Sequence, residues 1–217
     1  MGDNGCNDRE KRGPIPIRVI NRLPVYHRSL SNLLDRGVER ISSARLGEKL
    51  GLTSSQIRQD FNCFGSFGRR GYGYNIQKLH DEIGKILGIN EGMKMVLIGA
   101  GNLGKAIANY PKFSQRGFVI KAIFEKDSEL VGNKINGIPV YDVEKLDVFL
   151  NKCDIDIGII ATPPGPAKQL AKVLIDKGVK GIWNFAPTTF DFNNNVVIEN
   201  VHISESLFSL SCRIKEE

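Results

Sequence analysis

The chain of 217 residues has only four cysteines, three histidines and one tryptophan, and it contains no long hydrophobic run. The cysteines (Cys6, Cys63, Cys153 and Cys212) lie far apart without a Cys-x-x-Cys pair, which predicts reduced thiols and neither a metal site nor a disulfide framework. No apolar run approaches the ~20 residues that cross a membrane, and the polar N-terminus lacks the apolar core of a signal peptide. These absences predict a cytoplasmic protein without a membrane segment.

Acidic residues are outnumbered in one part of the chain only. Residues 1–85 hold 15 lysines and arginines against 9 aspartates and glutamates, whereas residues 86–217 hold 15 of each, so the first part carries the whole net charge of +6. A basic segment beside a neutral one predicts an anionic macromolecule as the partner of the basic segment.

A glycine-rich stretch follows an apolar run in the middle of the chain. Residues 93–98 have the composition of a buried strand, and residues 105–110 contain good helix formers before Pro111. In the Gly-x-Gly-x-x-Gly motif between them, the first glycine permits a tight turn, the second lets the backbone approach a pyrophosphate, and the third lets the helix pack on the strand. The N–H groups at the positive end of the helix then face the phosphates. The predicted phosphate-binding residues are Gly99, Ala100, Gly101, Asn102, Leu103 and Gly104.

A second predicted strand, residues 118–124, ends in Glu125. An acid at the tip of that strand, roughly 20 residues past the loop, binds an adenosine ribose 2′-hydroxyl in dinucleotide-binding folds. Its negative charge repels a 2′-phosphate, which favours NAD(H) over NADP(H). The alternative is a glycine turn in another kind of α/β sheet, with Glu125 as a solvated strand end.

The remainder alternates between strand and helix patterns, which predicts a parallel sheet with covering helices. Strands are expected at residues 138–141, 155–160, 181–185 and 196–199, and helices at residues 143–151 and 167–177. Because ligands bind beyond the carboxyl ends of parallel strands, Thr162, Pro163, Asn184 and Phe185 are expected near the dinucleotide.

Four helices are predicted after a disordered arm at residues 1–13, and the last of them, at residues 76–90, forms the junction between the domains. The first follows Pro24 and ends near Gly37; the second begins at Ser42 and Ser43 and ends at Gly51. Thr53 and Gln56 form a capping box for the third helix. The core-facing side chains of the first and third helices are Tyr26, Leu30, Leu33, Leu34, Ile57, Phe61 and Phe64.

The second and third of these helices, joined by a short turn, have the spacing of a helix-turn-helix. The predicted helix-turn-helix region as a whole extends from about Tyr26 to Gly65. The third helix has Ser, Gln, Asn and Arg side chains on its outer face, which can reach phosphates and base edges. A small helical domain with a solvated helix is the alternative. Glycines, aromatic residues and two arginines follow at residues 65–74 and predict a β-hairpin wing that places cations against DNA. The predicted DNA-binding residues are Ser43, Ser54, Ser55, Gln56, Arg58, Gln59, Arg69 and Arg70.

The last segment has apolar residues at helical spacing, namely Ile203, Leu207, Leu210 and Ile214. An amphipathic helix at this position needs a covering surface, either its own domain or a second subunit. Both alternatives remain open from the sequence.

With these motifs in place, the chain resembles the Rex family of redox-sensing transcriptional repressors. The matching stretches are residues 20–26, 41–43, 56–58 with Asp60, 64–68, 71–74, 99–104 with Tyr110, and 182–187. The resemblance implies a homodimer with winged-helix and Rossmann-type domains and a swapped C-terminal helix. It also implies an operator that is held when NAD+ prevails and released when NADH binds, with Tyr110 near the nicotinamide. By this resemblance, Glu125 occupies the position where the family has an Asp, and Gln59 the position where the family commonly has a Lys.

The expected fold is an α/β Rossmann-type domain with a parallel sheet, preceded by an N-terminal winged helix-turn-helix domain. The expected boundaries are residues 14–87 for the DNA-binding domain, 88–203 for the NAD(H)-binding domain and 204–217 for the C-terminal helix. No histidine follows a sheet strand where hydride transfer would need an acid or base, so no catalytic residue is assigned and NAD(H) is expected as a sensed ligand. The alternatives are a small NAD-dependent oxidoreductase with a basic extension, and a DNA-binding protein whose α/β domain only dimerises.

Overall fold

A computed structural model describes residues 13–65, 67–69, 72–190, 192 and 196–216. The chain forms two compact units that meet between Ile89 and Asn90, close to the boundary expected at residues 87 and 88. Each unit has its own hydrophobic core. Among the described residues, no helix is long and apolar enough to cross a membrane.

The first unit combines five helices with a small antiparallel sheet. Its helices are α1 (Ile17–Ile20), α2 (Leu23–Leu34), α3 (Ser43–Leu50), α4 (Ser54–Asn62) and α5 (Ile76–Ile86). Its strands are β1 (Arg40–Ile41), β2 (Gly68–Arg69) and β3 (Gly73–Asn75), arranged in the order β1-β3-β2. This is a winged helix-turn-helix, as the sequence predicts.

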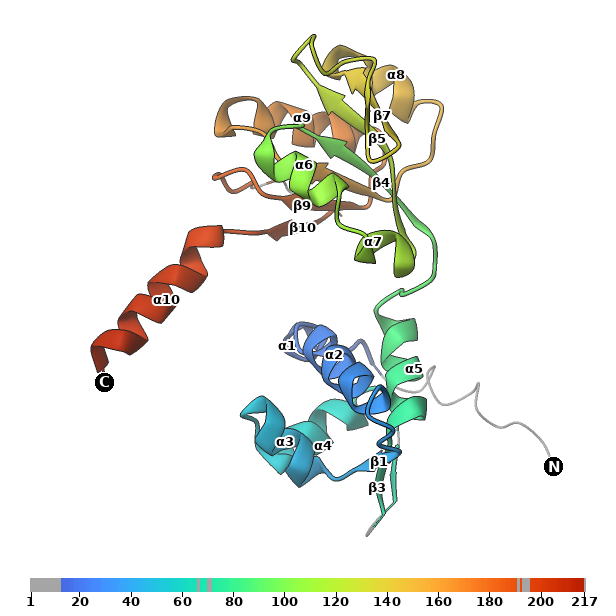
Figure 1. The fold of residues 1–217 in the computed structure, drawn as a ribbon, viewed down its shortest axis with the longest axis vertical. Helices are drawn as coiled ribbons and strands as arrows, with labels where there is room; N and C mark the ends of the chain where they lie inside the picture. Colours follow the sequence, from blue (N-terminus) through green and yellow to red (C-terminus); the bar gives the residue numbers. More distant parts are fainter. Residues whose placement is uncertain (1–12, 66, 70–71, 191, 193–195, 217) are drawn as a thin grey trace, which may run out of the picture. The chain divides into compact units, whose positions relative to one another are not determined.

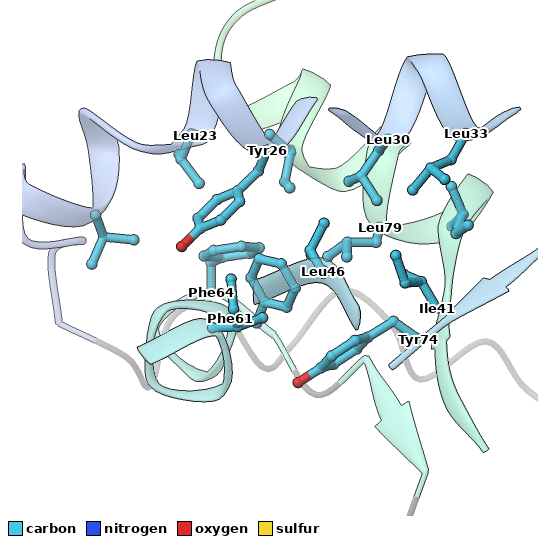
Figure 2. Close-up of a cluster of buried hydrophobic side chains, with 14 residues drawn as sticks. Leu23, Tyr26, Leu30, Leu33, Ile41, Leu46, Phe61, Phe64, Tyr74 and Leu79 are labelled. Atoms are coloured by element: carbon cyan, nitrogen blue, oxygen red, sulfur yellow. The ribbon is translucent and has the colours of Figure 1, made fainter. Parts of the chain in front are cut away.

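Apolar side chains from every helix of this unit meet in one core. Tyr26, Leu46, Ile57 and Leu79 are fully buried, and each comes from a different helix. Figure 2 shows Tyr26 of α2 lying above the rings of Phe61 and Phe64, which project from the region of α4. The Tyr26 and Phe61 rings meet edge to face at a centroid distance of 5.1 Å, a favourable geometry for aromatic pairs.

The second unit is built on a seven-stranded sheet with the order β10-β9-β8-β4-β5-β7-β6. All neighbouring strands are parallel except β6, which pairs antiparallel with β7. The strands are β4 (Met93–Ile98), β5 (Phe118–Glu125), β6 (Lys134–Ile135), β7 (Ile138–Asp142), β8 (Ile157–Ile160), β9 (Gly181–Asn184) and β10 (Val197–Asn200). Because β4 pairs with β5 on one side and β8 on the other, the strand order reverses at β4, and ligands of open α/β sheets bind at such a point.

Helices cover both faces of this sheet (Figure 1). The helical elements are α6 (Asn102–Ala108), α7 (Lys112–Gln115), a 3-10 turn (Val143–Lys145), α8 (Leu146–Leu150), α9 (Pro164–Asp176) and α10 (Ile203–Glu216). Val96 and Ile98 of β4 pack toward α8 and α9, whereas Met95 and Leu97 pack toward α6. This alternation explains why the strand sequence is apolar throughout.

Several boundaries differ from those expected. α2 begins at Leu23 with Pro24 in its first turn, and α9 begins at Pro164 rather than at residue 167. Proline is compatible with the first helical turn, where its missing N–H would have no intrahelical partner. The short elements α1 and β6 were not predicted, because pieces of four and two residues carry no periodic pattern.

Candidate functional site

The glycine loop connects β4 to α6, and its three glycines have different surroundings. Gly99 has φ +101°, and a Cβ there would lie 2.5 Å from the Ala161 carbonyl oxygen of the neighbouring β8 segment. A Cβ on Gly104 would clash with the carbonyl oxygen of Gly99, so the helix packs directly on the turn. A Cβ on Gly101 would meet nothing within 4 Å, which leaves the loop open on its outer side. Such an open backbone at a helix start can accept a phosphate group.

A cavity of about 400 Å³ lies beside this loop, where β4, β5 and β8 end. Its walls are largely apolar, as a pocket for a flat heterocycle requires. The lining residues are Ile98, Gly99, Gly101, Phe124, Glu125, Lys126, Val143, Ala161, Thr162, Pro163, Gly165, Pro166 and Leu170. Five of the predicted cofactor-binding residues, Gly99, Gly101, Glu125, Thr162 and Pro163, therefore meet at one cavity.

Glu125 is held at the rim of this cavity by backbone donors. Its Oε2 accepts a hydrogen bond from the Ala100 N–H at 2.5 Å, and its Oε1 accepts from Lys126 N–H at 2.8 Å and Asp127 N–H at 3.2 Å. The carboxylate thus lies between the tip of β5 and the glycine loop. A ribose bound against the loop would find this acceptor beside its hydroxyl groups.

The other predicted cofactor residues are placed elsewhere. Ala100 is buried and Leu103 packs into the core on the α6 side, whereas Asn102 is exposed at the start of α6. Tyr110 is 47% exposed and packs on Phe113 at a ring distance of 4.8 Å. None of these four side chains lines the cavity of 400 Å³, so their contacts with a cofactor stay a prediction.

Asn184 is fully buried and shapes the turn after β9. Its amide nitrogen donates to the Thr188 carbonyl at 2.7 Å and to Asn200 Oδ1 at 2.8 Å, and its oxygen accepts from Ala186 N–H at 3.0 Å. Phe185 packs on Trp183 at 4.6 Å. Both residues support the edge of the sheet at β9 and lie outside the lining of this cavity, so they too remain predictions as cofactor contacts.

The helix-turn-helix consists of α3 and α4. Ser42 Oγ accepts from Arg45 N–H and Thr53 Oγ1 from Gln56 N–H, each at 3.1 Å, and Gly51 ends α3 with φ +66°. These caps set where both helices begin and where the first one ends. A Cβ on Gly47 would clash with the Leu52 carbonyl, so α3 lies very close to the turn that leads into α4.

The predicted DNA-facing side chains share the outer side of these helices. Ser55, Arg58 and Gln59 are exposed, and Ser43, Ser54 and Gln56 are partly exposed. Arg58 Nη1 donates to Ser43 Oγ at 3.2 Å, which orients the guanidinium across the two helices. In the wing, Arg69 belongs to β2, but its side chain and all of Arg70 lie outside the described residues.

One charged cluster in this unit was missed by sequence reasoning. Asp60 of α4 is 3% exposed and binds Arg22 and Tyr26 near the start of α2. The hydrogen bond to Asp60 raises the pKa of Arg22, and burial, with the Asp60 hydrogen bond second, raises the pKa of Tyr26. A signal was present, since Asp60 lies at helical spacing between the apolar Ile57 and Phe64.

The C-terminal helix α10 has no buried residue. Its large apolar side chains are 44% to 66% exposed, namely Ile203, Leu207, Phe208, Leu210 and Ile214. In the described chain, its own domain does not cover this apolar face, and the surface that covers it stays a prediction. A second cavity, about 360 Å³, lies on the α7 side of the sheet beside Phe113, Phe118 and Trp183, with Arg116 and Glu199 also in its lining. Among the described residues, no group of three or more His, Cys, Asp or Glu side chains is arranged to hold a metal ion.

Comparison with known proteins identifies relatives along nearly the whole chain. The family model of a putative DNA-binding protein N-terminus matches residues 14–62, and that of a CoA binding domain matches residues 90–188. Relatives named redox-sensing transcriptional repressor Rex, from Clostridium botulinum (strain Hall) and Clostridium acetobutylicum (strain ATCC 824), are 50% identical over 207 residues. These alignments cover 95% of this chain and 99% and 97% of the two relatives.

Solved structures of a Rex-family repressor, RSP, have the same fold. RSP in complex with β-NAD+ and operator DNA is 47% identical with a TM-score of 0.88, and the match covers 94% of each chain. RSP in complex with β-NADH is 45% identical with a TM-score of 0.87, covering 94% of this chain and 96% of RSP.

Replacing the loop glycines separately tests their different roles. Gly104→Ala should lower the free energy of unfolding by ~1–3 kcal/mol, because the added methyl group is forced against the Gly99 carbonyl. Gly101→Ala should leave thermal unfolding almost unchanged but weaken NADH binding about tenfold or more, because the methyl group occupies the open side of the loop. Thermal unfolding and titration calorimetry measure the two effects. Equal NADH affinity in Gly101→Ala and the wild type would contradict the assignment of the loop.

Proposed function

The chain belongs to the Rex family of redox-sensing transcriptional repressors, and we propose that it holds operator DNA when NAD+ prevails and releases it when NADH binds. One observation carries the proposal: a single chain joins a helix-turn-helix with exposed donors to a glycine loop that has Glu125 at its side. The relative RSP binds β-NAD+ together with operator DNA, and it also binds β-NADH.

In this proposal, the first unit binds DNA and the second unit binds the dinucleotide. The exposed face of α4, with Ser55, Arg58 and Gln59, enters the major groove, and the wing with Arg69 and Arg70 lies against the DNA backbone. In the second unit the glycine loop binds the pyrophosphate, and the cavity lined by Phe124, Val143 and Leu170 receives the adenine.

The cofactor acts as a signal and not as a reagent in this proposal. NAD+ carries a positive nicotinamide ring and NADH a neutral one, so the nicotinamide subsite must bind the two forms with different strength. A ligand shifts a two-state protein only by its differential affinity for the two states. A DNA-bound regulator of this kind acts in the cytoplasm.

A binding experiment tests the proposal. Fluorescence anisotropy with labelled palindromic duplexes, whose half-sites lie one helical turn or a multiple apart, gives operator affinity with NADH or NAD+ added. NADH should weaken binding about 5- to 150-fold, the usual range of allosteric coupling, and NAD+ should not. Because linkage is reciprocal, operator DNA should weaken NADH binding by the same factor. Equal NADH affinity with and without operator contradicts the sensing role, and turnover of NADH with a carbonyl substrate would favour an oxidoreductase.

Glu125→Gln tests the proposed ribose contact. The substitution keeps the side-chain length but removes the charge, so NADH binding should weaken about tenfold, in line with the ~1.5–3 kcal/mol of a hydrogen bond to a charged group. The preference for NADH over NADPH should fall as well, because the repulsion of a 2′-phosphate is lost. Asp127→Asn removes a charge two residues away that does not line the cavity, and serves as the control. Equal effects of both substitutions on the NADH to NADPH ratio would exclude this role of Glu125.

We also propose a homodimer in which α10 packs on a second copy of the chain. The exposed apolar face of α10 needs a cover, and the cavity beside Phe113 and Trp183 offers an apolar surface of suitable size. In the dimer, each helix would be exchanged between the copies.

Charge substitutions on α10 test this assembly. Leu207→Glu with Leu210→Glu should raise the dimer dissociation constant at least ~100-fold, because each buried leucine contributes ~1.5–3 kcal/mol. Ser209→Glu adds a charge on the opposite side of the helix and should leave the dimer intact. Sedimentation equilibrium measures both. A stable dimer of the double variant would exclude α10 from the interface.

A further inference from the structure

A buried carboxylate lies on α4 at the border of its core face, where Asp60 lines a cavity of about 310 Å³ together with Gln56 and Gln59. Asp60 is 3% exposed and stands next to Phe61, which is 1% exposed. Arg22 donates two hydrogen bonds of 2.7 Å, from Nε to Oδ2 and from Nη2 to Oδ1, and the Tyr26 hydroxyl donates to Oδ2 at 2.5 Å. Both oxygens are thus bound by one segment at the beginning of α2.

These bonds restrict α4 in a way that its apolar contacts do not. Apolar contacts specify direction less sharply, because the hydrophobic effect is roughly proportional to buried area. A forked guanidinium–carboxylate pair has a defined plane and two defined distances. If α4 slid or rotated, Asp60 would lose the hydrogen bonds from Arg22 and Tyr26, and a carboxylate that loses its partners in the protein interior is very unfavourable.

We propose that Asp60, held by Arg22 and Tyr26, is the positioning residue that sets the rotation and the depth of α4 against DNA. This role rests on the proposed function of α4 as the recognition helix. The contact inside the domain would then decide how well α4 recognises a DNA sequence. Figure 2 shows Tyr26 and Phe61 in the core between the two helices. The Tyr26 ring packs on Phe61 while its hydroxyl reaches Asp60, so one side chain joins the apolar core to the charged pair.

The proposal predicts a loss of specificity rather than a general loss of affinity. Hydrogen bonds to base edges require placement to within ~0.5 Å and 10–20°. Attraction to phosphates is long-ranged and tolerates small displacements. A displaced α4 should therefore bind operator DNA more weakly while its binding to unrelated DNA is nearly unchanged.

Two conservative variants test the pair without removing the buried charge. Tyr26→Phe keeps the ring and deletes only the hydroxyl that donates to Asp60. Arg22→Lys keeps the positive charge but loses the fork that binds both oxygens. In each variant the ratio of operator affinity to random-duplex affinity should fall about tenfold, with the random-duplex affinity within about twofold of the wild type.

Ser31→Ala is the matched control. Ser31 also belongs to α2 and its Oγ bonds His80 Nε2 of α5 at 3.0 Å, so the substitution removes a hydrogen bond of α2 that does not reach α4. All variants are compared by anisotropy at a temperature where circular dichroism shows each to be folded. Ser31→Ala should lower the unfolding temperature but keep the specificity ratio.

The outcomes are distinct. A fall in the ratio for Tyr26→Phe and Arg22→Lys, with none for Ser31→Ala, supports the positioning role. An unchanged ratio in all three, or an equal fall in all three, overturns it and leaves the cluster as a stabilising contact only. If the wild-type protein itself binds no palindromic duplex better than random DNA, the DNA-binding function fails and this inference fails with it.

Discussion

The direct contact between Gly104 of α6 and the carbonyl of Gly99 is the constraint on which the second unit depends. Because neither position can hold a Cβ without a clash, the helix starts immediately after the turn and its N–H groups face the edge where β4, β5 and β8 end. The turn at Gly99 also brings the loop against the Ala161 carbonyl, so the loop and the end of β8 form one wall. The cavity at this edge is therefore a consequence of backbone packing, and the side chains around it decide which ligand it accepts.

Two carboxylates, one in each unit, are held in place in different ways. Glu125 lies at a cavity rim and is bound by three backbone N–H groups, so it is ordered but can exchange partners with a ligand hydroxyl. Asp60 is buried and is bound by two side chains, those of Arg22 and Tyr26. The first arrangement suits recognition and the second suits positioning, and the difference follows from access to the carboxylate.

A sensor of this kind needs a connection between its nucleotide and its DNA, and one hydrogen bond lies close to the start of α10. Asn184 ties the end of β9 to Asn200 at the end of β10, and α10 begins three residues beyond Asn200. The end of β9 is thus joined by a hydrogen bond to the end of β10, just before α10 begins. A rigid link of this type transmits a shift only when it has two arrangements that the ligands distinguish.

Local chemistry let the sequence determine most of the fold. The contact between Gly99 and Gly104, the caps at Ser42 and Thr53, and the apolar periodicities of the first unit depend on interactions within a few residues, and each appears in the structure as its pattern predicts. Contacts between distant residues came only from the tertiary structure. Arg22 and Asp60 are 38 residues apart, and although the spacing of Asp60 indicates a core-facing position, nothing in the sequence pairs the two residues. The complete burial of Asn184 and the exposure of α10 likewise depend on which elements pack together. Periodicity indicates that a face is apolar, but only packing decides what covers it, since the hydrophobic effect does not specify a partner.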